Sequence, residues 1–168
     1  MTDLSLTIRP ELPHDAHAIE KLHERAFGPG RFARTAYRLR EGVPHEAELS
    51  FTALVGTLVV ASIRMTRITA GGAPALLLGP VTVDPAFEKR GIGMALVTRA
   101  LEAARGAGHA LVILVGDEPF YGKVGFRRVP HGTLAMPGPV DAARLLYLEL
   151  VEGSFGPARG MITKSAGS

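Results

Sequence analysis

The segment Val83–Leu96 constrains this sequence most, because it predicts a strand, a short loop and the beginning of a helix. Two glycines, Gly91 and Gly93, stand where that helix would begin. The first turn of a helix leaves about four N–H groups without partners inside the helix, and the helix dipole adds positive charge there. Because glycine has no Cβ, an anion can approach the backbone closely. With Lys89 and Arg90 beside them, these glycines predict a phosphate-binding site.

Other patterns also place two glycines at the beginning of a helix. A Walker loop requires Lys and then Ser or Thr after its last glycine, where Met94 and Ala95 stand in this chain. A dinucleotide fingerprint requires a third small residue where Leu96 stands. Neither pattern fits, and the simpler alternative, glycines that only provide a turn, stays open.

Apolar periodicity and turn residues predict the other elements of the chain. Apolar residues at helical spacing follow Asp15, which is expected to cap that helix. The pair Gly56-Thr57 is typical of a tight hairpin, and the apolar run Leu111–Val115 is typical of a strand covered on both faces. The pair Gly79-Pro80 indicates a bend or bulge. The expected strands are 4–9, 49–55, 58–68, 75–83, 111–115, one from 126, and 145–151; the expected helices lie at 15–28, 31–40, 91–105 and 119–123.

An antiparallel hairpin followed by a strand–helix–strand unit predicts one domain of the α/β or α+β class over residues 1–168. With 46% hydrophobic and 21% charged residues, the chain is long enough to bury a core. Residues 153–168 are rich in Gly, Ser and Pro, and we expect them to form a loose tail. The apolar runs of the whole chain are too short to cross a membrane. The amino terminus lacks the pattern of a signal peptide, so a cytoplasmic location is the default expectation.

A second motif follows the strand predicted at 111–115, in the segment Val115–Phe126, which reads VGDEPFYGKVGF. Together with Glu88–Gly93, it resembles the GNAT superfamily of acetyl-CoA-dependent N-acetyltransferases. That family has a Gln/Arg-x-x-Gly-x-Gly/Ala loop between its fourth strand and third helix. It also has a Phe-Tyr-x-Lys-x-Gly-Phe segment after its fifth strand. Both motifs occur here in the same order with a strand between them, and Leu148–Ser154 is similar to one bacterial branch of the family.

The resemblance implies a mixed, mostly antiparallel sheet of six or seven strands with helices on both faces. It implies acetyl-CoA as the acetyl donor, with the pantetheine arm along one strand and the pyrophosphate on the amides of the glycine loop. Tyr121 would be the general acid, because tyrosine is protonated at neutral pH and can donate to the departing sulfur. Glu88 departs from the family pattern, since Gln or Arg is usual there. The residues expected to contact the donor are Val81, Thr82, Val83, Glu88, Lys89, Arg90, Gly91, Ile92, Gly93 and Met94.

Acetyl transfer to an amine also needs a stabilised oxyanion and a base. The backbone N–H of Val81 or Val83, near the expected bulge, would stabilise the negative charge on the acetyl oxygen. A base or a water chain is needed because an alkyl amine of pKa near ~10 is mostly charged at pH 7. The strand 75–83 contains no Glu, Asp or His. The base stays unassigned among candidates that also fit surface or turn positions, which are Glu46, Glu48, His109 and Asp117.

The charge pattern bears on the partners of this protein. Its net charge is +3, and its densest basic cluster is Arg31, Arg34, Arg38 and Arg40. An exposed helix face explains that cluster, so we expect no nucleic acid and no membrane as partner. The histidines show no metal-ligand spacing, and there is no cysteine. We expect a small-molecule or peptide amine as acceptor, and a monomer or homodimer. Two alternatives stay open: a sensor that binds acetyl- or acyl-CoA without catalysis, and an RNA-associated protein.

Overall fold

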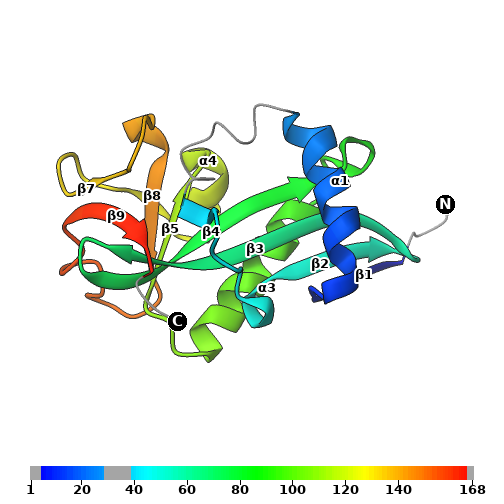
Figure 1. The fold of residues 1–168 in the computed structure, drawn as a ribbon, viewed down its shortest axis with the longest axis horizontal. Coiled ribbons are helices and arrows are strands. Elements are labelled where there is room, and N and C mark those ends of the chain that lie inside the picture. The colour runs from blue at the N-terminus through cyan, green and yellow to red at the C-terminus, as the bar shows by residue number, and fades with distance from the viewer. Residues whose placement is uncertain (1–4, 29–38, 166–168) are drawn as a thin grey trace.

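One mixed sheet runs through the molecule, and α1 (Ala16–Phe27) and α3 (Ile92–Gly106) lie on its opposite faces (Figure 1). The structure is a computed structural model that describes residues 5–28 and 39–165. The strands are β1 Leu6–Pro10, β2 Phe51–Val55, β3 Leu58–Ala70, β4 Ala73–Val83, β5 Leu111–Val115, β6 Arg127–Arg128, β7 Leu134–Ala135, β8 Leu145–Glu149 and β9 Gly160–Lys164. The short helices are η1 Pro13–Asp15, η3 Ala47–Leu49, η4 Pro85–Phe87, α4 Glu118–Tyr121, η5 Gly122–Val124 and η6 Ala142–Arg144.

The strand order confirms the expected class of fold. The main path of the sheet is β1-β2-β3-β4-β5-β8-β6, and β9 pairs with both β3 and β7. Among the described strands, only β4 with β5 and β7 with β9 pair in parallel. The sheet is therefore mostly antiparallel, with helices on both faces as predicted. No helix in the described part of the chain is long and apolar enough to span a membrane.

Helix α3 buries an apolar stripe against one face of the sheet. In Figure 1 it lies behind the strands, whereas α1 crosses in front of them. This interface is the largest buried apolar cluster of the protein. Full burial of each large aliphatic side chain in it contributes about 1.5–3 kcal/mol to folding. The stripe consists of Ile92, Leu96, Val97, Ala100, Leu101 and Ala104, which pack against apolar side chains of β2, β3, β4 and β5.

A buried carboxylate, that of Asp15, anchors α1 to the opposite face. It accepts two hydrogen bonds from the guanidinium of Arg9, at 2.7 and 3.0 Å, and one from the Leu12 N–H at 2.8 Å. The hydroxyl of Thr52 in β2 donates to the same group at 3.3 Å. The bonds from Arg9 lower the pKa of Asp15 to about 2. The expected role of this aspartate as a side-chain cap of α1 is therefore wrong, because Arg9, Leu12 and Thr52 use its oxygens.

The loose tail predicted for residues 153–168 is also wrong, as far as residue 165. Strand β9 pairs with the end of β3 and with β7. Three apolar side chains of this segment, Phe155, Ala158 and Ile162, are buried. The ring of Phe155 stacks on Tyr147 at 3.9 Å between centroids. The Gly and Pro residues form turns between these anchors, so composition alone did not reveal the packing.

Part of the sequence prediction falls outside the described residues. The helix expected at 31–40 overlaps the structure only at Leu39 and Arg40, and Arg31, Arg34 and Arg38 of the basic cluster lie in the undescribed segment.

The strand expected from Phe126 is only two residues long, Arg127–Arg128. His23 of α1 is buried.

Because β9 belongs to the fold, truncating a buried side chain in it should destabilise the protein. We expect Ile162→Ala to lower the free energy of unfolding by about 2–5 kcal/mol, since Ile162 is fully buried. The neighbouring Met161 is 48% exposed, and Met161→Ala is the matched control with little expected effect. Urea unfolding of both variants measures the difference. Equal stability of the two would mean that β9 is not packed as described.

Candidate active site

The sheet opens where β4 parts from β5. The two strands pair in parallel only at Leu76 with Val112 and at Leu77 with Ile113. On its other side, β4 stays paired with β3 as far as Val83. The edge of β4 that faces β5 is therefore without a strand partner beyond Leu77, within the described part of the chain. An open edge of this kind leaves backbone N–H and C=O groups available to a ligand.

A bulge in β4 marks the point of separation. Ile63 and Met65 of β3 pair with Val81 and Leu78, so two residues of β4 lie opposite the one residue, Arg64, between them. Gly79 lies there with a φ of 126°, in the range that favours glycine. This confirms the bend expected at Gly79-Pro80, and the bulge directs the following part of β4 away from β5.

The beginning of α3 carries the glycine loop. Gly91 adopts a φ of 80° as the N-cap residue, and its carbonyl accepts the helical hydrogen bond from Ala95 at 3.1 Å. The N–H groups of Ile92, Gly93 and Met94 come before that first helical donor, so they are the free donors of the helix start. Lys89 and Arg90 are exposed beside them, and so is Glu88. The side chain of Ile92 is buried in the core, so only its backbone is available to a ligand.

The predicted elements converge at Gly93. A Cβ atom at this position would lie 3.7 Å from Cγ2 of Val83 in β4 and 3.8 Å from Cζ of Phe120 in α4. The start of α3, the open strand and the Phe-Tyr motif therefore meet at one place. Val81 and Val83 are partly buried and Thr82 is fully buried, which positions the backbone of this strand firmly.

Tyr121 ends α4, which follows β5 through Gly116. Its ring packs edge-on against Phe120 and Phe126, with centroids at 4.9 and 5.8 Å. A Cβ atom at Gly116 would come within 2.5 Å of the tyrosine ring, so glycine is needed there. Burial raises the pKa of Tyr121 to about 12, with Arg144 opposing this rise and Asp117 adding to it. The hydroxyl therefore stays protonated at neutral pH.

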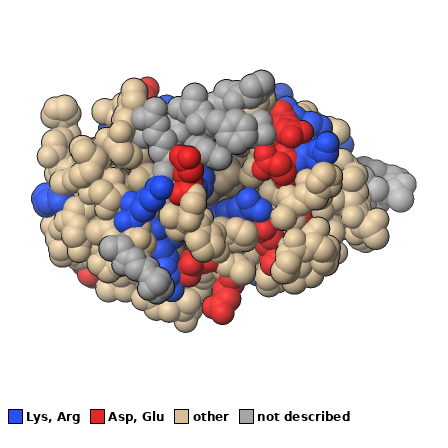
Figure 2. All heavy atoms as spheres, viewed as in Figure 1, with Lys and Arg blue, Asp and Glu red and all other residues tan. Residues whose placement is uncertain are grey.

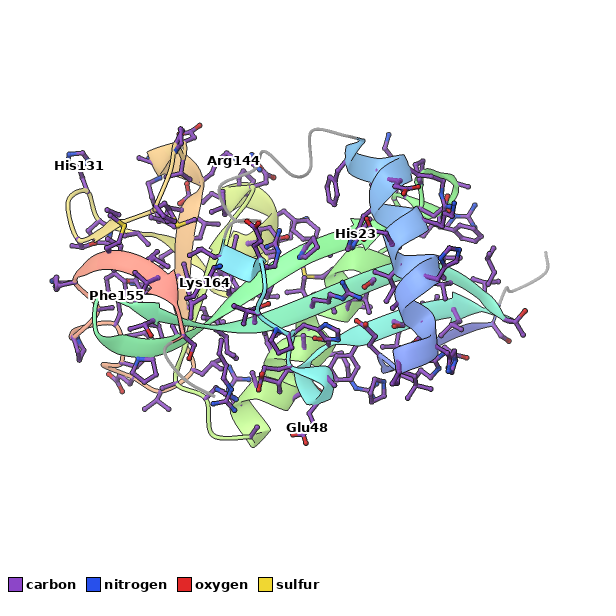
Figure 3. All side chains as sticks on the ribbon, in the orientation of Figure 1. His23, Glu48, His131, Arg144, Phe155 and Lys164 are labelled. Carbon is purple, nitrogen blue, oxygen red and sulfur yellow. The ribbon has the colours of Figure 1, made fainter. Side chains whose placement is uncertain are left out.

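The four candidates for the base have different surroundings in the structure. Asp117 precedes α4 and accepts backbone hydrogen bonds from Phe120 and Tyr121 through its carbonyl. Glu46 forms an ion pair with Arg67 at 2.7 Å. Glu48 is exposed and projects away from the sheet (Figure 3). Burial lowers the pKa of His109, which precedes β5. Of these four, Asp117 alone has a contact with the Phe-Tyr motif among those described.

One charged cluster, which we name the Glu11 cluster, was not predicted. It consists of Glu11, His45 and Arg64, from three separate parts of the chain. Arg64 donates to both carboxylate oxygens of Glu11 at 2.9 Å, and His45 Nε2 lies 3.2 Å from Glu11 Oε2. Its members are up to 53 residues apart, so no local sequence pattern indicates it.

The fold and this opening resemble those expected of a CoA-dependent acyltransferase. The family described as "Acetyltransferase (GNAT) domain" matches residues 47–128, which run from η3 to β6. This match supports membership of the GNAT superfamily of N-acetyltransferases, which the two motifs indicated.

Known proteins resemble the chain over nearly its whole length. The uncharacterized N-acetyltransferase YhbS of Escherichia coli K12 is 25% identical over 94% of this chain and 95% of its own. The crystal structure of E. coli YhbS in complex with CoA superposes with a TM-score of 0.82, at 23% identity, over 98% of this chain and 92% of that one. A GNAT family acetyltransferase from Brucella melitensis, in complex with acetyl-CoA, has a TM-score of 0.62 and 28% identity, over 91% and 99% of the two chains.

The raised pKa of Tyr121 can be tested by titration of tyrosine absorbance. We expect one tyrosine of the native protein to ionise late, near pH 12, and Tyr121→Phe should remove that step. The control Tyr147→Phe keeps its ring stack and should leave the late step in place. Because the folded pKa exceeds the ordinary value near 10, stability should fall as pH rises from about 10 to about 12. Circular dichroism identifies any unfolding in this range, and early ionisation of every tyrosine in folded protein contradicts the assignment.

Proposed function

We propose that the protein transfers the acetyl group of acetyl-CoA to a primary amine by direct attack, with the donor held between β4 and β5. The separation of these strands beside the start of α3 carries the proposal. The complexes of YhbS with CoA and of the Brucella enzyme with acetyl-CoA support the choice of donor. The most direct test is thiol release from acetyl-CoA with a panel of alkyl amines, amino acids and peptides that have free amino termini.

The start of α3 fits the pyrophosphate of the donor. The N–H groups of Ile92, Gly93 and Met94 would donate to phosphate oxygens, and the helix dipole favours their negative charge. Lys89 and Arg90 add positive charge at the same place. Glu88 is exposed, so its carboxylate has room to lie in solvent, away from the phosphates, while its backbone lines the loop.

The open edge of β4 fits the pantetheine arm. Its amide groups would hydrogen-bond to the backbone of Val81 and Val83, as a partner strand would, while Thr82 between them pairs with β3. The N–H of Val81, next to the bulge, would donate to the acetyl oxygen as negative charge develops on it. Because the bulge fixes this N–H before the donor binds, little reorganisation is needed during the reaction.

Tyr121 would act at the departing sulfur. A hydroxyl that keeps its proton at neutral pH can hydrogen-bond to the thiolate as the C–S bond breaks and supply its proton. Its position on α4, next to Phe120 and therefore near Gly93, supports this role. For the acceptor we propose a small molecule or a peptide with a primary amine.

The glycine loop generates a prediction for donor binding. Gly93→Val should remove most of the rise in melting temperature that acetyl-CoA causes, because side-chain atoms would enter the space next to Val83 and Phe120. Gly106→Val is the matched control, since this glycine ends the same helix and a Cβ there meets no atom within 4 Å. Thermal unfolding with and without acetyl-CoA measures the shift. An unchanged shift in folded Gly93→Val protein would refute the placement of the pyrophosphate.

The role of Tyr121 generates a prediction for catalysis. Tyr121→Phe keeps the ring and its packing but removes the donor, so turnover should fall ~10²–10⁴-fold. The affinity for acetyl-CoA should change little, because the hydroxyl acts mainly in the transition state. Tyr147→Phe is the matched control and should keep full turnover. Full activity of Tyr121→Phe contradicts the assignment, and wild-type protein that binds acetyl-CoA but never turns it over would be a sensor.

A further inference from the structure

The Glu11 cluster contains a histidine that is held by a buried carboxylate. The side chain of Glu11 is only 3% exposed, whereas that of His45 is 29% exposed. Burial opposes ionisation of Glu11, but the hydrogen bonds from His45 and Arg64 outweigh it and hold its pKa below the ordinary value. An ionised Glu11 can only accept hydrogen bonds, so Nε2 of His45 must carry a proton. The neutral imidazole then has its free lone pair on Nδ1.

This cluster lies on the sheet next to the bulge of β4. Arg64 stands in β3 between Ile63 and Met65, whose partners in β4 are Val81 and Leu78. Neighbouring residues of a strand point to opposite faces. Because Ile63 and Met65 pack in the core beneath α3, Arg64 points to the other face.

The segment that carries His45 crosses the same part of the sheet. At its beginning, Nη1 of Arg40 lies 3.9 Å from the position that a Cβ atom would take at Gly79 in the bulge. At its end, the N–H of Glu46 donates to the carbonyl of Met65 at 2.8 Å. In Figure 1 this segment descends in front of β4 and β3 towards η3. His45 is therefore on the face of the sheet that α3 does not cover.

An amine that attacks the acetyl group must approach from that face. The core beneath α3 fills the opposite face, where Ile63, Met65 and Leu78 are buried. The strand 75–83 has no Glu, Asp or His that could take the proton of the amine. The Glu11 cluster holds a histidine between the neighbouring strand and the loop on that face.

We propose that His45 is the proton acceptor for the attacking amine and that Glu11 is its positioning residue. This inference rests on the proposed acetyl transfer. The lone pair of the neutral amine forms the new C–N bond, and Nδ1 of His45 takes one N–H proton, directly or through water. The C–S bond then breaks, and the sulfur takes the proton of Tyr121. His45 is partly exposed, so it can return its proton to solvent, and Tyr121 regains one.

The other charged groups around His45 are mostly paired. Glu46, its neighbour in the chain, pairs with Arg67 of β3, and Arg64 pairs with Glu11. Arg40 from the same segment faces the bulge at Gly79. Figure 2 shows acidic and basic side chains interspersed on this face. Because these paired charges largely offset one another, we expect removal of the Glu11 charge to dominate any change at His45.

The test is the pH dependence of kcat/KM, measured with the fastest alkyl amine of the panel as the probe. The wild type should show one acidic inflection in addition to the dependence on free amine, because a base must be unprotonated to accept a proton. His45→Gln should lower kcat/KM ~10²-fold or more and remove that inflection. Its amide can still donate to Glu11, which preserves the packing. Glu11→Gln should move the inflection to lower pH, because loss of a negative charge disfavours the protonated imidazole.

The control is His131→Gln, which changes an exposed histidine at the opposite end of the molecule from α1 (Figure 3). It should match the wild type at every pH. A His45→Gln variant with full activity overturns the inference. A His45→Gln variant whose kcat/KM falls by the same factor at every pH, with the inflection kept, also overturns it, because such a loss indicates a structural role. In both cases an intact acetyl-CoA shift and an intact effect of Tyr121→Phe leave the proposed function standing.

Discussion

The separation of β4 from β5 is the constraint on which the rest of the site depends. Two parallel strands that stayed paired would use their backbone groups on each other and leave none for a ligand. The bulge at Gly79 ends the pairing after Leu77, while β3 continues to support β4 as far as Val83. The sheet can therefore open on one side of β4 without losing the strand itself. The start of α3 and the tyrosine of α4 are close to the opening because both follow directly from the two strands that part.

The two faces of the sheet hold their helices in different ways. Beneath α3 the contacts are apolar, and burial of these side chains favours folding. On the other face, the carboxylates of Glu11 and Asp15 are buried, and each is held by an arginine. Such buried pairs add little net stability, but loss of one partner is costly because the other charge stays buried. They act mainly by setting where α1 and the segment after residue 39 lie.

The sequence predicted what local patterns encode. The strand Leu111–Val115, the helix after Gly91 and the bend at Gly79-Pro80 all depend on neighbouring residues, and the structure contains each of them. Two short motifs were enough to indicate the family. The prediction failed where distant segments meet, as in β9, whose Ile162 is buried only because β3 and β7 lie beside it. The Glu11 cluster was missed for the same reason, since Arg64 and Glu11 are 53 residues apart in the sequence.

The two roles of Ile92 have a mechanical consequence. Its side chain is 5% exposed and belongs to the main core, while its backbone N–H belongs to the helix start that faces the opening. The loop therefore cannot move far unless the core behind it also rearranges, and close-packed cores resist such movement. Substitutions at the buried residues Leu96 or Leu114 would then change the stiffness of the proposed donor site. Directed evolution of this protein for altered donor preference would find useful positions in that inner layer as well as at the surface of the loop.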